Sequence, residues 1–573
     1  MKFLNIFLVS IVIFNTAPLQ ANDEAILAGQ RAEPVAGKKA MVVTSHHLAT
    51  KIALNILKSG GNAIDAAVAA GFALAVTQPR SGNIGGGGFM LYSPNDSDGV
   101  TAIDYREKAP SRAYENMFLN DMGNGDQALS RFSHLSAGVP GTVAGFTLAL
   151  EKFGTMSLAE VLQPAINLAI NGFEVPNRFV EGIAARKKVF DKWPASKATF
   201  FKQDGSSYKA GEIFKQPDLA KTLQRIADKG AAGFYTGETA KLIESEMQKH
   251  GGLISYEDLE NYQAVIRPPV HGTYRGFDVY SMSPPSSGGV HIVQILNMLA
   301  SYPINQYGHN SAQTIHLMAE TMRRAYADRA SYLGDSDFVD VPLRGLTSKS
   351  YANALVKKIQ LDKATPSVEI KAGTPQHYES PETTHFSIVD QLGNAVSNTY
   401  TLNFSYGSGI VVAGAGFLLN NEMDDFSAKP GATNAYGLIG GEANKIEPNK
   451  RMLSSMSPTI VKYAGKNFLI TGSPGGSRII STTLQVIMNV IDHKMNIQTA
   501  VNSPRIHHQW WPDEIRVEQG ISPDTIKLLI NMGHKVEQKS AMGGSQSILV
   551  DKESDALYGA ADPRQSTSMA AGF

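Results

Sequence analysis

The sequence predicts a large protein that combines α-helices with β-strands. Of its 573 residues, 43% are hydrophobic and 18% are charged, an ordinary globular mixture with enough apolar material for a large core. Some segments carry the apolar stripe of a helix, and other, shorter segments have strand character. Length allows several domains or one large layered architecture, so composition alone leaves the domain count open.

Helices are predicted first in the N-terminal half. His47–Lys58 and Ala63–Val76 both carry apolar stripes, and Ser59-Gly60-Gly61-Asn62 between them supplies a glycine C-cap and an asparagine N-cap. The alanine-rich second helix is expected to pack closely against another element. Further helices are predicted at Leu158–Asn171, Pro217–Lys229, Gly289–Ser301 and Asn310–Tyr332.

Strand patterns follow the glycine run Gly85–Gly88 and recur in the C-terminal third, at Phe386–Val389, Ala395–Thr401, Thr459–Val461 and Phe468–Thr471. The glycine run itself comes after a helix and a turn, not after a strand. A dinucleotide fingerprint is therefore not indicated, and we interpret the run as close backbone packing near a pocket.

Charge and cysteine content exclude several classes of function. Lys plus Arg and Asp plus Glu both number 52, so the formal net charge is zero, and no basic run indicates a nucleic-acid partner. Because the chain has no Cys, thiolate metal sites, cysteine nucleophiles and disulfides are all excluded.

Residues 1–21 resemble a signal peptide. Lys2 precedes the apolar run Phe3–Phe14, which is too short for a membrane-spanning helix, and Leu19-Gln20-Ala21 offers a cleavage site after Ala21. An anchor retained in the mature protein is the alternative. No later segment looks like a membrane span. We expect a periplasmic or secreted protein.

The stretch Thr383-Thr384-His385-Phe386-Ser387 carries the main chemical signal. A Thr hydroxyl is a poor nucleophile, and no His-Asp relay flanks it. A cut between Glu382 and Thr383 would free an α-amine that can serve as the base, with a pKa of roughly 7.7–8.0. The hypothesis is a zymogen in which the Thr383 hydroxyl attacks the carbonyl of Glu382. The polar stretch Ser367–Glu382 before it is expected to be exposed.

Several separated motifs resemble the γ-glutamyltransferase family (γ-glutamyltranspeptidase/glutathione hydrolase) of N-terminal nucleophile hydrolases. They are GGNAIDAAVAAGFALAVTQPRSGNIGGGGFM, DYREKAP, SAGVPGTVAGF, TTHFSIVDQLGNAVSNTYTLNFSYGSG, LLNNEMDDFSAKPG, NKRMLSSMSPTIV and TGSPGGSRII. The resemblance covers nearly the whole chain after the leader. It implies an α+β fold, a four-layer αββα sandwich. It also implies a large subunit, residues 22–382, and a small subunit, 383–573, that stay together as a heterodimer.

The resemblance further assigns a donor site for glutathione and other γ-glutamyl compounds. Its donor-binding residues are Arg106, Asn403, Glu422, Asp425, Ser454 and Ser455. A guanidinium fork fits a carboxylate in a bidentate manner, and a γ-glutamyl donor also carries an ammonium group that needs nearby acids. Asp424 is interpreted as a solvated or capping residue. Thr401 is assigned to orient Thr383, although it also suits a strand.

Two further elements are assigned to catalysis. Gly475-Gly476 lies between a strand and a helix, where backbone N–H groups can stabilise an oxyanion. A phosphate-binding loop is not indicated, because no Gly-Lys-Ser/Thr sequence follows these glycines. The alternative to an oxyanion site is a simple tight turn. In the long loop Pro430–Lys450, Tyr436 matches the lid of bacterial relatives, with a tolerated surface insertion as the alternative.

The expected reaction is transfer of a γ-glutamyl group to water, an amino acid or a dipeptide. No cofactor and no metal are assigned, because the pairs His46-His47 and His507-His508 lack metal-ligand spacing. Two alternatives stay open. One keeps the nucleophile but cuts glutaryl-type side chains or poly-γ-glutamate, and the other is an exported binding protein with an inactive site.

Overall fold

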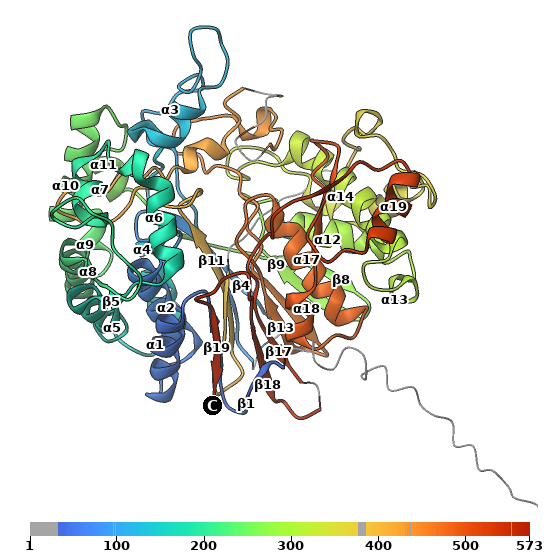
Figure 1. Ribbon diagram of the computed structural model, residues 1–573, viewed down its shortest axis with the longest axis horizontal. Coiled ribbons are helices and arrows are strands. Elements are labelled where there is room, and N and C mark those ends of the chain that lie inside the picture. Colours follow the sequence, from blue (N-terminus) through green and yellow to red (C-terminus); the bar gives the residue numbers. More distant parts are fainter. Residues whose placement is uncertain are drawn as a thin grey trace, which may run out of the picture.

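Two seven-stranded antiparallel sheets lie face to face in the middle of the molecule, and helices cover the outer side of each (Figure 1). The computed structural model describes residues 33–375 and 385–573, except positions 96, 98, 430, 432, 433, 435, 436 and 552. These layers confirm the predicted αββα sandwich.

The first sheet, called the β11 sheet below, holds the strands that border the predicted nucleophile. In spatial order its strands are β19 (Met569–Gly572), β2 (Met41–Thr44), β10 (Phe386–Val389), β11 (Ala395–Thr401), β3 (Gly87–Ser93), β4 (Thr101–Tyr105) and β7 (Val265–Arg267). The second, the β13 sheet, contains β1 (Val35–Gly37), β18 (Leu557–Ala561), β17 (Gln546–Val550), β13 (Lys466–Thr471), β12 (Thr459–Tyr463), β9 (Phe277–Ser281) and β8 (Val270–Tyr274). Two small sheets complete the strands: β14 (Ile506–His507), β15 (Ile515–Val517) and β16 (Val536–Gln538); β5 (Phe173–Glu174) and β6 (Ile213–Phe214).

Both faces of the central strands are buried, which explains their nearly continuous hydrophobic sequences. In β3, Phe89 and Leu91 face the other sheet, whereas Met90 packs against the outer helices. In β12, Ile460 lies between the sheets and Val461 packs against the helices on the opposite side. Because side chains alternate along a strand, each strand contributes to two cores.

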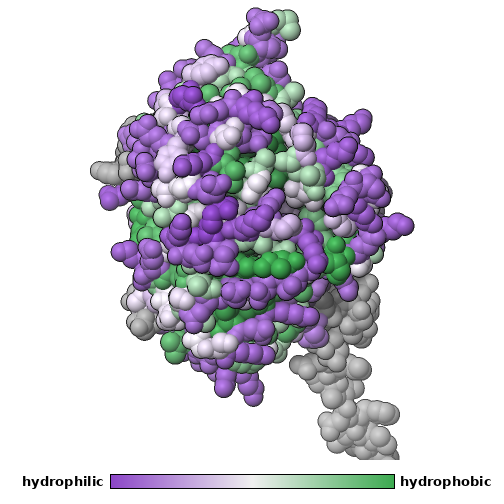
Figure 2. Space-filling model, turned by 90° about the vertical axis from the view of Figure 1, so that its left-hand side faces the viewer, coloured by the Kyte–Doolittle hydropathy of each residue, from purple (hydrophilic) through white to green (hydrophobic). Residues whose placement is uncertain are grey.

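The N-terminal helices cover the β11 sheet, on the left in Figure 1. They are α1 (His47–Lys58), α2 (Ala63–Thr77), α3 (Gln127–Phe132), α4 (Thr142–Phe153), α5 (Leu158–Asn171), α6 (Asn177–Phe190), α7 (Pro194–Phe200), α8 (Pro217–Lys229), α9 (Ala232–Tyr235), α10 (Gly237–His250) and α11 (Tyr256–Glu260). All of α2 is buried, as its alanine-rich sequence predicts. The outward face of this layer is mostly hydrophilic (Figure 2).

The remaining helices cover the β13 sheet. They are α12 (Gly288–Leu299), α13 (Ile304–Tyr307), α14 (Ala312–Tyr332), α15 (Leu343–Leu346), α16 (Lys349–Val356), α17 (Arg478–Ile491), α18 (Ile497–Asn502) and α19 (Pro523–Asn531). Short 3₁₀ turns lie at His134–Ser136, Ser367–Glu369, Glu422–Asp425 and Glu442–Asn444. Within the described ranges, no helix combines the length and apolar character needed to cross a membrane.

The two sides of the predicted cut share both sheets. In the β11 sheet, β10 comes after position 383 and lies between β2, from before that position, and β11. In the β13 sheet, β12 pairs with β9 across the same divide. A cut before Thr383 would therefore leave two pieces that are hydrogen-bonded along several strands.

The stretch that begins at Ser367 was expected to be exposed, and most of its described positions, 367–375, are exposed or half-buried, with Val368 70% exposed. Ser367 and Ile370 differ, because both are buried. Asp513 explains the difference, because its carboxylate accepts a hydrogen bond from the backbone N–H of Ser367 at 2.7 Å. The end of the stretch, with Glu382, lies outside the described residues.

Candidate active site

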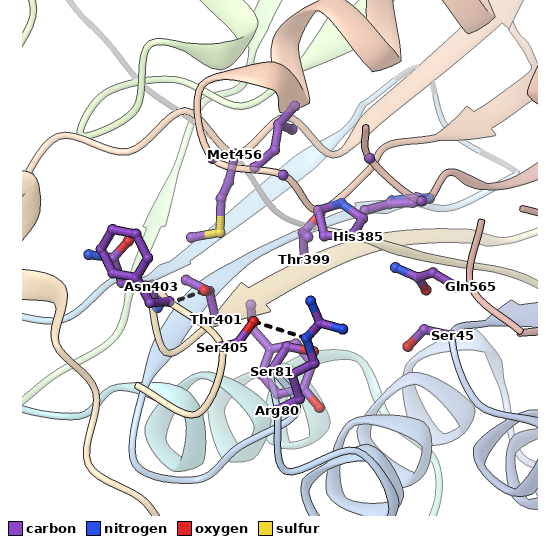
Figure 3. A pocket seen from close by; sticks show the side chains of 18 of the residues that line it. Ser45, Arg80, Ser81, His385, Thr399, Thr401, Asn403, Ser405, Met456 and Gln565 are labelled. Carbon is purple, nitrogen blue, oxygen red and sulfur yellow. Dashed lines mark hydrogen bonds between the residues drawn. The ribbon is translucent and has the colours of Figure 1, made fainter. Parts of the chain in front are cut away.

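One cavity of about 670 Å³ brings together most of the predicted site residues (Figure 3). Its lining includes Arg106, Thr401, Asn403, Glu422, Asp425, Ser454, Ser455, Gly475 and Gly476. Their segments are far apart in the sequence, so only the fold can gather them. Glu382, Thr383 and Tyr436 lie outside the described residues, but His385 and Leu438, from the two segments concerned, also line the cavity.

Strand β11 ends at the cavity. Thr399 and Thr401 both line it, as the period of a strand predicts. The Thr401 hydroxyl oxygen accepts a hydrogen bond from the backbone N–H of Asn403 at 2.8 Å. Asn403 has a left-handed backbone with φ of 74°, and its amide donates to the carbonyl of Asn421 at 3.0 Å. The Thr401 hydroxyl proton therefore remains available for another acceptor.

The glycine run lets a neighbouring chain approach Thr401. A Cβ on Gly86 would lie 2.0 Å from the carbonyl oxygen of Thr401, and one on Gly88 would lie 2.5 Å from the carbonyl oxygen of Thr399. Gly87 pairs with Thr401 in the register of β3 and β11. The interpretation as close backbone packing beside a pocket is confirmed.

Arg106 lies at the centre of a buried cluster of charges. Its Nη1 donates to Glu422 at 2.6 Å and its Nη2 donates to Asp425 at 2.7 Å. Nε donates to the carbonyl of Met452 at 3.2 Å, and Nη1 also contacts Glu107 at 3.4 Å. These contacts engage four of the five N–H groups of the guanidinium. A bidentate contact with a substrate carboxylate therefore requires an exchange with Glu422 or Asp425.

The acids around Arg106 hold on to their protons more strongly than exposed acids do. Burial raises the pKa of Glu107 to about 7, although Arg106 acts in the opposite direction. Burial likewise raises the pKa of Glu422 and of Asp425. An ammonium group placed among these three acids would favour their ionised forms, so the cluster suits the amino group of an amino acid.

Asp424 does not belong to this cluster. Its carboxylate accepts a 2.6 Å hydrogen bond from the hydroxyl of Ser130. The residue is buried, so the expectation of a solvated Asp is wrong.

Ser454 and Ser455 present their hydroxyl groups near a second arginine. The Arg329 side chain, from α14, donates through Nε to Ser287 at 2.9 Å and through Nη2 to Ser455 at 3.4 Å. Arg329 is only 5% exposed and lines the cavity. Across the described part of the chain it has no ion pair within 4.0 Å, and burial lowers its pKa.

Gly475 and Gly476 form the turn between β13 and α17. Their φ angles are 140° and 60°, in a region that favours glycine. The predicted strand-to-helix turn is confirmed, and its backbone lines the cavity. Amide groups in such a turn can point at a reacting carbonyl without any side chain.

His385 fixes the start of β10 next to the cavity. Its Nδ1 lies 3.0 Å from the Ser397 hydroxyl and its Nε2 lies 2.7 Å from the Ser387 hydroxyl and also contacts the carbonyl of Gln546. Burial lowers the pKa of His385 to about 3, so the ring is neutral at physiological pH. A neutral, fully bonded ring orients the chain and does not act as a base.

Sequence reasoning gave no site role to Arg329 or to Glu107. Glu107 directly follows Arg106, and the two residues are both fully buried. Its place beside Arg106 in the motif DYREKAP was the available signal. Arg329 had no such signal, because it lies on a helix whose position relative to Ser455 depends on the fold.

The two histidine pairs have structural surroundings. His46 is the N-cap of α1, its Nδ1 accepts from the N–H of Leu48, and its ring stacks on His47 at 4.6 Å. His507 contacts Ser481 and Gln509.

Two other groups of His and Glu side chains lie close together, His134, Glu246 and His250, and His316, Glu320 and His534. Nε2 of His134 and Nε2 of His250 lie 3.0 and 3.7 Å from the same carboxylate oxygen of Glu246, so the carboxylate already serves as the partner of both rings. Glu320 forms ion pairs with Arg323 and Arg324. We assign no metal to either group.

Comparison with known proteins identifies the family. The family model described as gamma-glutamyltranspeptidase matches residues 49–572. The chain therefore belongs to the gamma-glutamyltranspeptidase family of enzymes.

Among individual relatives, the glutathione hydrolase proenzyme of Escherichia coli (strain K12) is 54% identical over 541 residues, which cover 94% of this chain and 93% of the relative. An acylase ACY 1 proenzyme of a Pseudomonas species (strain SE83) is 36% identical, with 92% and 93% covered.

Solved structures agree with the fold. A cephalosporin acylase from Bacillus halodurans superposes with a TM-score of 0.83 at 28% identity, covering 95% of this chain and 97% of that one. The gamma-glutamyltranspeptidase of Helicobacter pylori has a TM-score of 0.56 at 49% identity, covering 58% and 94%. The predicted N-terminal nucleophile hydrolase fold is confirmed.

Proposed function

We propose that this protein is a self-cleaving γ-glutamyltransferase and glutathione hydrolase. The observation that carries the proposal is the charge pattern of the cavity. Arg106 is held between Glu422 and Asp425, with the hydroxyl groups of Ser454 and Ser455 lining the same space. Cation, acids and hydroxyls together fit the α-carboxylate and α-ammonium groups of a γ-glutamyl donor.

The nucleophile in this proposal is Thr383, two residues before His385. Two residues of chain span at most roughly 7 Å, so a terminal threonine stays close to the cavity that His385 lines. During maturation the Thr383 hydroxyl adds to the carbonyl of Glu382 and the C–N bond breaks. Water then hydrolyses the resulting ester, which leaves a carboxylate on Glu382 and a free amine on Thr383.

In catalysis the same hydroxyl attacks the γ-carbonyl of the donor, and its proton passes to the Thr383 amine. Thr401 orients the hydroxyl, and the amide groups of Gly475 and Gly476 stabilise the oxyanion. The C–N bond then breaks, and the leaving amine takes the proton. Water, an amino acid or a dipeptide attacks the acyl-enzyme, and the Thr383 hydroxyl is restored.

The two subunits are proposed as residues 22–382 and 383–573, held together as a heterodimer. Support comes from the strands that the two segments share in both sheets. Tyr436 is proposed as the lid residue, because Leu438 from the same loop lines the cavity. A periplasmic or secreted location is proposed from the leader-like pattern of residues 1–21 and the lack of cysteine.

The test combines mass and kinetics. N-terminal sequencing and intact mass of the purified protein should give two chains, one beginning at Thr383, and Thr383→Ala should stay as one inactive chain. The processed enzyme should hydrolyse a γ-glutamyl anilide much faster than the glutaryl anilide, which lacks the ammonium group. An active uncut chain, or an equal rate on both anilides, would refute the proposal.

A further inference from the structure

A second hollow, of about 800 Å³, adjoins the active-site cavity. Three arginines line it, Arg80, Arg178 and Arg186, and we call it the arginine groove. Its other lining residues are Asn177, Glu181, Gly182, Ala185, Ser405, Tyr406 and Ser566. Neither the donor site nor the nucleophile proposed above uses the three arginines.

The arginine groove and the active-site cavity are continuous. Arg80, Arg178, Ser405 and Tyr406 line both spaces. Ser405 lies only two residues after Asn403, which lines the cavity beside Thr401. In Figure 3 the guanidinium of Arg80 reaches into the cavity beside Ser405, to which a dashed line joins it. A ligand that extends from the donor site in this direction therefore passes Arg80 and Arg178.

The hydrogen-bond partners of Arg80 and Arg178 are uncharged groups. Arg80 donates through Nε to the hydroxyl of Ser405 at 2.9 Å, and Arg178 donates through Nη1 to the carbonyl of Arg564 at 2.6 Å. In the residues that the structure describes, neither arginine has an ion pair within 4.0 Å. Glu181 is the one carboxylate among the described residues that line the arginine groove.

Like charges are also crowded here. Burial and, next, the neighbouring Arg80 lower the pKa of Arg178. Burial raises the pKa of Tyr406 to about 12, while Arg80, Arg186 and Arg178 all act to lower it, so the three guanidiniums surround one phenol. Concentrated charge of one sign in a cleft costs stability and is typical of sites that bind the opposite charge.

We propose that the arginine groove binds the carboxylate of the amine component of the reaction, the amino acid or peptide that leaves the donor or accepts the γ-glutamyl group. This inference rests on the proposed function and names the substrate class on that side of the scissile bond. The arginines touch no atom whose bonds change, so they act by holding the amine in line with the acyl carbonyl.

Ser405, which accepts a hydrogen bond from Arg80, follows Asn403 by two residues, so their Cα atoms lie at most roughly 7 Å apart, about the length of a dipeptide. Guanidinium groups also match carboxylates better than any other side chain does. We expect a dipeptide whose amine enters the cavity beside Asn403 to place its carboxylate at Arg80 or Arg178.

The experiment compares two acceptors that differ only in charge, glycylglycine and glycylglycine amide. Transfer from γ-glutamyl-4-nitroanilide is measured with each acceptor, and the readout is the ratio of their KM values. For the wild type the amide should have a KM roughly tenfold higher, because it lacks one charge-assisted contact. Added salt should reduce this ratio, since the arginine groove is open to solvent.

Arg178→Gln, Arg80→Gln or both should bring the ratio close to one. Lys188→Gln is the matched control, because Lys188 is an exposed cation that lies on helix α6, like Arg178, but outside the arginine groove. The ratio of KM values for this variant should equal that of the wild type. A wild-type ratio near one, or a ratio that both arginine variants retain, would overturn the inference. If a variant fails to mature, the ratio of KM values for the wild type and its dependence on salt still test the inference.

The donor reaction separates this inference from the proposed function. If the wild type does not release nitroaniline from γ-glutamyl-4-nitroanilide, the proposed function fails. If it does, but the two acceptors behave alike, only the assignment of the arginine groove fails.

Discussion

Glu422 accepts a 2.6 Å hydrogen bond from Nη1 of Arg106, although the two residues are 316 positions apart in the sequence. They lie on opposite sides of the proposed cut, and both are fully buried. The donor site is therefore assembled from both segments before any substrate binds. The same contact restricts Arg106, because its fork is already engaged by acids.

Replacement of Arg106 by lysine should raise the donor KM by at least roughly tenfold, because an ammonium group cannot reproduce the fork that meets Glu422, Asp425 and the donor together. Steady-state kinetics with γ-glutamyl-4-nitroanilide on processed protein measure this change. An unchanged donor KM would remove Arg106 from the donor site.

Arg329→Gln should also raise the donor KM, by roughly tenfold, because the cation beside Ser455 is lost. Its effect on the free energy of unfolding should stay within about 1 kcal/mol, since no ion pair is broken. Arg324→Gln is the contrasting variant, because Arg324 pairs with the buried Glu320. It should cost about 3 kcal/mol of stability and leave the donor KM unchanged. Equal kinetic effects of the two variants would argue against a role for Arg329 at the site.

Gly475→Ala should lower kcat by at least roughly tenfold, because a residue with a Cβ is strained by about 1–3 kcal/mol at this backbone conformation and the turn must shift. Circular dichroism and initial rates measure fold and activity separately. The control is Gly251→Ala, since Gly251 ends α10 with φ of 74° and has open space around its Cα. That variant should lose about 1 kcal/mol of stability and no activity. A fully active Gly475→Ala enzyme would exclude this turn from oxyanion stabilisation.

Stability should fall as the pH drops below about 6. Burial lowers the pKa of His46 to about 3 and that of His508 to about 4, and both rings accept a backbone hydrogen bond through Nδ1. In the unfolded chain these histidines have a pKa near 6.5 and bind protons, whereas in the folded chain they stay neutral. Lowering the pH from about 6.5 therefore stabilises the unfolded state relative to the folded state. Each such residue costs up to about 2 kcal/mol at pH 5.

Thermal unfolding between pH 5 and pH 8 tests this expectation. The midpoint should decrease on the acidic side, and His508→Gln should make the decrease shallower. A midpoint that rises towards pH 5 would contradict the sign of the effect.

The sequence predicts much of the local structure. The bounds of α1, α5 and α8 agree with the expected helices, because apolar stripes, caps and an initial proline are local signals. The order of strands in the two sheets is not local and was not predicted; only the layered architecture followed from the family resemblance. For Thr383 and Tyr436, which lie outside the described residues, the assigned roles stay predictions.

Site residues that lie within a family motif could be predicted from the sequence. Contacts between residues of distant segments could not. Arg106 and Asp425 were expected in one pocket because each lies in a family motif. In the structure, Nη2 of Arg106 donates to Oδ2 of Asp425 at 2.7 Å. Arg80 is part of a quoted motif too, but nothing in that motif predicts that Arg178 lies close to it. This proximity depends on the packing of α6 against the loop after β11, and the hydrophobic periodicity of the sequence does not predict such packing.

The shared sheets also bear on the timing of the proposed maturation. Because β10 lies between β2 and β11, the two segments that the proposed cut would separate come together only in a chain that has already folded. Every group that the proposed cleavage needs belongs to one polypeptide, so the half-time of processing should be the same in dilute and concentrated samples. Maturation would thus be a first-order, intramolecular process that begins when the chain folds and needs no other protein.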